Sequence, residues 1–181
     1  MKKCVLVSGG AGFIGSHVTV ELIESGYDVI VADNLSNSDL TCFEGVKKIT
    51  GKEDIPFYKM DFCDEKATDD LFATNKIDAV IHFAGFKAVG ESVAEPLKYY
   101  RNNLESFINV IESARRHGCR NILFSSSATV YGEPEKLPVT EESPRQSATS
   151  PYGNTKQMCE DILRDSVSAY SEIRGIALRY F

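Results

Sequence analysis

The fold is decided by residues 3–15, KCVLVSGGAGFIG, in which an apolar run leads directly into glycines spaced G-x-x-G-x-x-G. We expect a strand, then the glycine loop, then a helix. Glycines permit a tight turn and let the backbone approach a pyrophosphate closely, and a helix N-terminus attracts negative charge. The alternative is a glycine-rich turn without a ligand. The motif predicts a dinucleotide-binding loop whose contact residues are Gly9, Gly12 and Gly15.

Strand-like and helical segments alternate along the rest of the chain. Four of the strand candidates are almost continuously apolar at their centres, which is typical of strands covered by helices on both faces. Repeated β-α units predict right-handed crossovers and an α/β fold, a Rossmann-type doubly wound parallel sheet of six strands in the order 3-2-1-4-5-6. We expect strands at 3–8, 28–33, 56–60, 77–84, 120–126 and 173–179, and helices at 13–25, 38–49, 64–74, 95–117 and 151–171.

Length and composition limit the class of protein. The 181 residues, 43% hydrophobic and 25% charged, suit one globular domain with its own core. A net charge of -6 argues against nucleic acid as a partner. We expect no membrane association, because no apolar run approaches the ~20 residues of a membrane span. Five cysteines without a C-x-x-C pair favour reduced thiols and a cytoplasmic location, and the three histidines lack metal-ligand spacing.

Two acidic residues end predicted strands. Asp33 follows Gly15 by 18 residues, close to the ~20 at which an acid binds the adenosine ribose. A carboxylate there repels a 2′-phosphate, so NAD is favoured over NADP. The alternative is that Asp33 only starts a turn with Asn34. Asp61 ends the third strand, and we expect it either to reach adenine or to cap the helix at 64–74.

The stretch 150–156, SPYGNTK, carries a second chemical motif. Ser150 suits a helix N-cap, so Tyr152 and Lys156 should lie one turn apart on one face. We expect the helix N-terminus and the ammonium to lower the pKa of Tyr152 from ~10 toward neutrality. Tyr152 would then act as a general base, Ser127 would hydrogen-bond the reacting oxygen, and Lys156 would bind the nicotinamide ribose. An ordinary aromatic–lysine pair is the alternative.

Together these motifs resemble the extended short-chain dehydrogenase/reductase family. The similar segments span nearly the whole chain, at 9–15, 33–35, 83–92, 99–103, 125–132, 151–156 and 178–181. The likeness is to members that interconvert UDP-glucose and UDP-galactose by C4 epimerisation through a transient 4-keto sugar with bound NAD, which implies an isomerase. Related dehydratases carry an Asp-Glu pair where this chain has Ala128 and Thr129, so dehydration is disfavoured because eliminating water needs an acid–base pair.

The resemblance also implies a role for each matching residue. The implied catalytic residues are Ser127, Tyr152 and Lys156, and the implied sugar contacts are Lys87, Ser127, Tyr152 and Phe181. With the motif residues included, the expected NAD-binding set is Gly9, Gly12, Phe13, Ile14, Gly15, Asp33, Asn34, Leu35, Ser36, Asn37, Ser38, Asp61, Phe62, Phe83, Ala84, Gly85, Lys87, Asn102, Ser125, Tyr152, Lys156 and Tyr180.

In this family the chain continues past the sixth strand into a domain that grips the UDP-sugar. We therefore expect residues 1–181 to form the NAD-binding domain with the catalytic Ser, Tyr and Lys, and the C-terminal substrate domain to be absent. The family usually dimerises through helices corresponding to 95–117 and 151–171, which predicts a homodimer. Two alternatives stay open: a truncated NAD-binding module without turnover, and another family member acting on a nucleotide sugar, such as a uronate epimerase or a sugar reductase.

Overall fold

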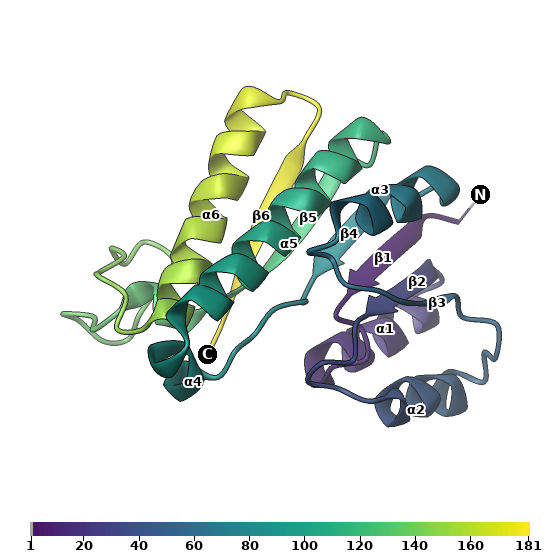
Figure 1. Cartoon of the computed structure of the whole chain (residues 1–181), viewed down its shortest axis with the longest axis horizontal. Coiled ribbons are helices and arrows are strands. Elements are labelled where there is room, and N and C mark those ends of the chain that lie inside the picture. The colour runs from purple at the N-terminus through teal and green to yellow at the C-terminus, as the bar shows by residue number, and fades with distance from the viewer. Residues whose placement is uncertain (1) are drawn as a thin grey trace.

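A computed structural model describes residues 2–181 of the chain (Figure 1). Six parallel strands form one sheet in the order β3-β2-β1-β4-β5-β6, which confirms the predicted fold. The order reverses between β1 and β4, at the centre of the sheet. The strands are β1 (Cys4–Ser8), β2 (Asp28–Asp33), β3 (Phe57–Lys59), β4 (Ala79–His82), β5 (Asn121–Ser127) and β6 (Arg174–Tyr180).

Helices cover both faces of this sheet. The pair α1 and α2 packs together, while α3 and α6 both pack against the long helix α5 (Figure 1). Two separate hydrophobic clusters match this division. No helix within residues 2–181 is long and apolar enough to cross a membrane. The helices are α1 (Phe13–Glu24), α2 (Leu40–Thr50), α3 (Glu65–Thr74), α4 (Val89–Ala94), α5 (Pro96–Arg116) and α6 (Pro151–Ala169), with a 3-10 turn, η1, at Ala128–Tyr131.

The segment after β4 holds one helix that the sequence did not predict. The helix predicted over 95–117 agrees with α5 to within one residue at either end, and the structure adds the short helix α4 before it. Proline disfavours helical geometry in the residue before it, and Glu95 adopts φ -126° and ψ 60° while Pro96 opens α5. The other strands and helices agree with their predicted bounds to within two residues at either end.

Candidate functional site

A cavity opens at the carboxyl ends of the strands, beside the point where the strand order reverses. Ligands of open α/β sheets bind at this position because the connections on its two sides diverge. The lining comes from the glycine loop, the ends of five strands, α5 and the first turns of α6. Its residues are Gly9, Gly12, Phe13, Ile14, Gly15, Asp33, Asn34, Ser36, Asn37, Met60, Asp61, Phe62, Phe83, Ala84, Gly85, Phe86, Lys87, Asn102, Ser106, Ser125, Ser126, Ser127, Tyr152, Lys156 and Tyr180.

The structure brings nearly every residue named from the sequence to this cavity. Leu35, Ser38 and Phe181 are the exceptions among the described residues. Phe181 is 87% exposed, and its ring stacks on Tyr131 at 6.1 Å between centroids. Residues that the sequence did not single out also line the cavity. They are Met60, Phe86, Ser106 and Ser126, and two of them could have been found as direct neighbours of Asp61 and Ser127.

The glycine loop forms a cradle of bare backbone. Gly9 adopts φ 75°, and a Cβ there would lie 2.6 Å from the backbone nitrogen of Ala84. A Cβ on Gly15 would collide with the carbonyl oxygen of Gly9. The N-cap of α1 is Gly12, which offers the first turn no capping side chain. These features suit a pyrophosphate, because the helix N-terminus presents amides and a positive dipole to an anion.

Asp33 organises the loops on either side of it. Its Oδ2 accepts from the backbone N–H of Ala11 at 3.0 Å. Its Oδ1 accepts from the backbone N–H of Leu35 at 2.9 Å and from the Ser38 hydroxyl at 3.0 Å. The carboxylate therefore starts a turn and also lines the cavity, so both sequence interpretations describe part of its role. Leu35 and Ser38 act here through Asp33.

The position of Asp61 decides between its two predicted roles. The N-cap of α3 is Asp64, whose Oδ1 accepts from the backbone N–H of Ala67 at 2.9 Å. Asp61 instead accepts from the Cys63 N–H at 2.9 Å and from the Asn34 amide at 3.2 Å. The helix-cap interpretation of Asp61 is therefore wrong, and its carboxylate lies in the cavity wall.

Lys156 is buried at the other end of the cavity. Ser150 caps α6 as predicted, accepting from the backbone N–H of Gly153 at 3.1 Å. The ammonium of Lys156, one turn beyond Tyr152, donates to the carbonyl oxygen of Ser125 at 2.7 Å. Burial lowers the pKa of Lys156 to about 8. The side chain is thus charged at neutral pH but held in a poorly solvated position.

The prediction that the pKa of Tyr152 falls is wrong for this structure. Burial raises the pKa of the phenol, and the neighbouring Ser127 hydroxyl acts in the opposite direction. The Lys156 nitrogen lies 5.8 Å from the centroid of the Tyr152 ring and is directed at Ser125. Tyr152 and Lys156 lie on the same face of α6, but the ammonium of Lys156 does not contact the phenol oxygen of Tyr152.

Asn103 is a structural residue of the site that sequence reasoning missed. It lies on α5 and is almost fully buried. Its Oδ1 accepts from the backbone N–H of Phe86 at 2.8 Å, and its Nδ2 donates to the Phe86 carbonyl at 3.0 Å and to the Thr155 hydroxyl at 3.1 Å. Asn103 thereby joins the segment after β4 to α6. Its neighbour Asn102, which was predicted, lines the cavity itself.

Metal-binding side chains do not gather at the cavity. Within residues 2–181, no group of three or more His, Cys, Asp or Glu could hold a metal ion. The central histidine, His82, is buried at the end of β4, with its Nδ1 2.9 Å from the Ser8 hydroxyl. All five cysteines are free thiols, and Cys119 and Cys159 are buried.

Comparison with known proteins identifies the family. The sequence profile described as "NAD dependent epimerase/dehydratase family" matches residues 5–181. The chain belongs to this family. Among family members, it is 56% identical over 177 residues to a UDP-glucose 4-epimerase of Bacillus subtilis (strain 168), covering 98% of this chain and 52% of that protein. It is 50% identical over 183 residues to UDP-glucose 4-epimerase 2 of Arabidopsis thaliana, covering 100% of this chain and 52% of that protein.

Solved structures of the epimerase/dehydratase family superpose closely on the chain. UDP-glucose 4-epimerase from Bifidobacterium longum, in complex with NAD+ and UDP, is 50% identical with a TM-score of 0.96, over 99% of this chain and 53% of that one. The enzyme from Stenotrophomonas maltophila, with bound NAD and formylated UDP-arabinopyranose, is 40% identical with a TM-score of 0.93, over the same shares. The chain spans about half the length of the curated relatives that it matches.

Proposed function

We propose that residues 1–181 form the NAD-binding and catalytic part of an isomerase that inverts C4 of UDP-hexoses, interconverting UDP-glucose and UDP-galactose. The observation that carries the proposal is a single cavity that joins the glycine loop and Asp33 to Ser127, Tyr152 and Lys156. Relatives at 50–56% identity are named for this reaction.

The cavity fits NAD at three points. The bare backbone at Gly9 and Gly15 suits the pyrophosphate, because side chains there would fill the space that phosphates need. The Asp33 carboxylate suits free ribose hydroxyls and opposes a 2′-phosphate. We assign Asp61 and Phe62 to the adenine end and Tyr180 to the nicotinamide end, because all three line the cavity. When bound, NAD would accept a hydride from C4 of the sugar and return it to the opposite face.

The side chains of this protein would handle the proton. Tyr152 would remove it from the sugar's 4-hydroxyl and return it after the 4-keto sugar has turned. The raised pKa keeps the phenol protonated until an added positive charge or hydrogen bond favours the phenolate. Ser127 would share the hydrogen bond to the reacting oxygen, and Lys156 would bind the ribose. We assign Lys87 to the sugar side because it lines the same cavity.

Binding and turnover test the proposal separately. Calorimetry should detect NAD binding by the 181-residue chain. A chimera in which residues 1–181 replace the equivalent half of the Bacillus subtilis relative should convert UDP-galactose to UDP-glucose. Tyr152→Phe should abolish that conversion while NAD stays bound. Absence of NAD binding would overturn the proposal, and binding without conversion by the chimera would favour a module without turnover.

The choice among nucleotide sugars needs its own measurement. A panel of UDP-hexoses, UDP-uronates and UDP-N-acetylhexosamines offered to the chimera tests the proposed substrate class. Preference for UDP-galactose supports the UDP-glucose epimerase assignment. Preference for a uronate, or net reduction of a keto sugar, would replace it with another activity of the family.

We further propose a homodimer that associates through α5 and α6. Both helices expose apolar side chains, including Leu97 and Ile108 on α5 and Met158 on α6. Exposed apolar area of this kind is favourable to bury between subunits. Sedimentation should give a dimer mass for the wild type and a monomer mass for Ile108→Lys, and a wild-type monomer would contradict the proposal.

We also propose a cytoplasmic location, which the five free cysteines support.

A further inference from the structure

Glu160 is a buried carboxylate that the proposed mechanism does not use. It lies on α6 one turn beyond Lys156, and its side chain is only 8% exposed. Burial alone would raise the pKa of Glu160, but hydrogen bonds from Arg179 and Ser126 outweigh it and lower the pKa. A charged carboxylate is thus kept in the interior directly behind the catalytic residues.

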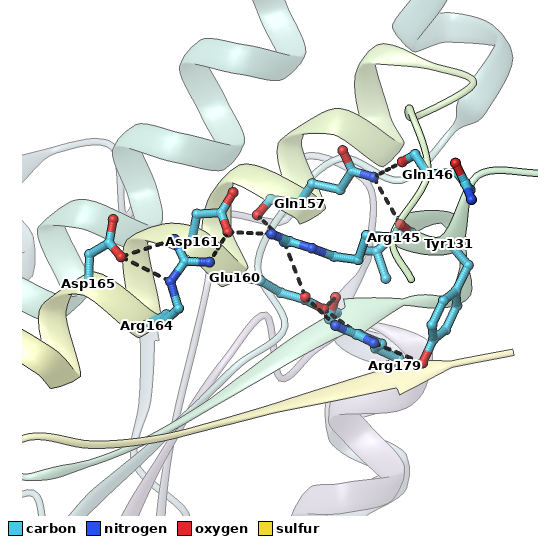
Figure 2. Close-up of polar contacts among 11 residues, drawn as sticks. Tyr131, Arg145, Gln146, Gln157, Glu160, Asp161, Arg164, Asp165 and Arg179 are labelled. Carbon is cyan, nitrogen blue, oxygen red and sulfur yellow. Dashed lines mark hydrogen bonds and ion pairs between the residues drawn. The ribbon is translucent and has the colours of Figure 1, made fainter. Parts of the chain in front are cut away.

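Donors reach this carboxylate from three other parts of the chain. The Ser126 hydroxyl on β5 donates to Oε1 at 2.6 Å. Arg179 on β6 donates in bidentate fashion, from Nε to Oε1 at 2.9 Å and from Nη2 to Oε2 at 2.8 Å (Figure 2). Arg145, from the loop between η1 and α6, approaches Oε2 at 3.5 Å. Bidentate arginine–carboxylate pairs fix orientation as well as distance.

The register of β5 and β6 carries this restraint into the site. Ser126 pairs with Arg179, and the next pair along the strands is Ser127 with Tyr180. The residue before Ser126 is Ser125, whose carbonyl accepts from Lys156. Three of the residues that flank these two bonded side chains line the cavity, namely Ser125, Ser127 and Tyr180.

Arg179 extends the restraint to the turn that follows β5. Its Nη1 donates to the Tyr131 hydroxyl at 2.8 Å, and its guanidinium lies 4.8 Å from the centroid of the Tyr131 ring (Figure 2). The turn η1 begins directly after Ser127, whose hydroxyl accepts from the backbone N–H of Thr129 at 3.2 Å. Ser127 therefore lies between two residues that Glu160 joins to α6, Ser126 directly and Tyr131 through Arg179.

We propose that Glu160 is the positioning residue of the catalytic end of the cavity, holding the ends of β5 and β6 on α6 so that Ser125, Ser127 and Tyr180 face Lys156 and Tyr152. The cavity role of these residues rests on the proposed function, whereas their geometry does not. Loss of the carboxylate should loosen the β5 end and let water reach the Lys156 ammonium.

The direction in which the pKa of Lys156 changes shows whether this loosening occurs. Removing a nearby negative charge would by itself lower the pKa of an ammonium, while hydration would raise it from about 8 toward 10.5. We expect Glu160→Gln to raise the pKa of Lys156. NMR of lysine labelled with ¹³C at Cε measures this pKa, and the signal that is lost in Lys156→Met identifies Lys156. An unchanged or lower pKa would overturn the proposal.

Asp161→Asn is the matched control. Asp161 is the next residue on α6 and accepts from Arg145 and Arg164, both at 2.6 Å (Figure 2). It belongs to the outer half of the same ion-pair cluster, but its two arginine partners lie on α6 and the adjoining loop. Asp161→Asn should leave the Lys156 titration where it is, and an equal shift in this variant would overturn the specific role of Glu160.

A double variant separates positioning from fold stability. Removing one member of a buried ion pair leaves the other uncompensated, whereas removing both relieves that cost. We expect Glu160→Gln with Arg179→Met to melt at a higher temperature than Glu160→Gln alone and to keep the altered Lys156 titration. A double variant that regains both the melting temperature and the wild-type titration would show that Glu160 acts only through stability.

Ligand affinity gives a second readout that separates this proposal from the proposed function. ADP should contact only the glycine loop and the Asp33 end, so its affinity should stay unchanged in Glu160→Gln, while NAD affinity falls about tenfold, or ~1.4 kcal/mol. Equal loss for both ligands would contradict the proposal. If the wild type binds neither ligand, the proposed function fails, and the Lys156 titration still decides the role of Glu160.

Discussion

The ammonium of Lys156 donates to the backbone carbonyl of Ser125 at 2.7 Å, which ties helix α6 to the end of β5. The partner is a neutral carbonyl, and no Asp or Glu within residues 2–181 forms an ion pair with this lysine. The charge is therefore buried without full compensation. A buried lysine of this kind makes folding stability depend on pH in a defined direction.

Lys156 should make the protein more stable as the pH rises through the range from about 8 to 10.5. Between its folded pKa of about 8 and its ordinary value of 10.5, the unfolded chain binds more protons at this side chain, so stability rises with pH. Relative to Lys156→Met, the wild type should gain up to about 3 kcal/mol over that interval. Urea unfolding of both proteins at several pH values measures the difference.

Lys48→Met is the control for that experiment. Lys48 is exposed on α2, so Lys48→Met makes the same chemical change at a lysine that is in contact with solvent. The stability difference between this variant and the wild type should stay nearly flat over the same pH interval. A flat difference for Lys156→Met as well would mean that the ammonium is solvated.

His82 should make the protein sensitive to acid. The ring is buried among Phe62, Phe107 and Phe124, and burial lowers its pKa to about 3. The unfolded chain takes up this proton near pH 6.5, so stability falls as the pH drops from 6.5 toward 3. At pH 4.5 the loss due to this ring should be about 2–3 kcal/mol.

His82→Phe tests this assignment by the shape of its pH profile. The variant leaves the Ser8 hydroxyl without its 2.9 Å partner, so we expect it to be less stable than the wild type at pH 7. Its stability should nevertheless change less between pH 7 and 4.5, measured by urea unfolding. Parallel profiles for the two proteins would place the acid-sensitive group elsewhere.

The sequence predicted the fold and most cavity residues because their signals are local. These signals are the apolar strand centres, the glycine spacing and the cap at Ser150, and each is read from residues that are neighbours in the sequence. The topology of a parallel sheet then brings the strand ends together at one edge. Which of Asp61 and Asp64 caps α3 depends on a shift of three residues, which is comparable to the uncertainty of a helix start predicted from sequence. The roles of Asn103 and Glu160 depend on partners 15 to 56 residues away, which no local pattern specifies.

Asp33→Asn should weaken the fold around the glycine loop. Both carboxylate oxygens accept from donors, Oδ2 from Ala11 and Oδ1 from Leu35 and Ser38. An asparagine would turn one acceptor into a donor facing another donor, at a cost of about 1–3 kcal/mol. Urea unfolding should record this loss, together with weaker NAD binding by calorimetry.

Asp39→Asn is the matched change for Asp33→Asn. Asp39 is the N-cap of α2 and accepts from the backbone N–H of Thr41 at 2.6 Å. Asparagine caps helices about as well as aspartate, so this variant should unfold close to the wild type. A similar loss in both variants would show that general charge removal, and not the hydrogen bonds of Asp33, sets the stability.

Gly15→Ala and Gly45→Ala should have opposite effects although both replace a glycine inside a helix. Alanine favours a helix interior by about 1 kcal/mol over glycine, and a Cβ at Gly45 would meet open space among the described residues. Gly45→Ala should therefore stabilise the protein. At Gly15 the added methyl would collide with the Gly9 carbonyl, so we expect lower stability and lost NAD affinity. Thermal unfolding and calorimetry on the two variants decide the point, and a stabilised Gly15→Ala that still binds NAD would contradict the backbone cradle.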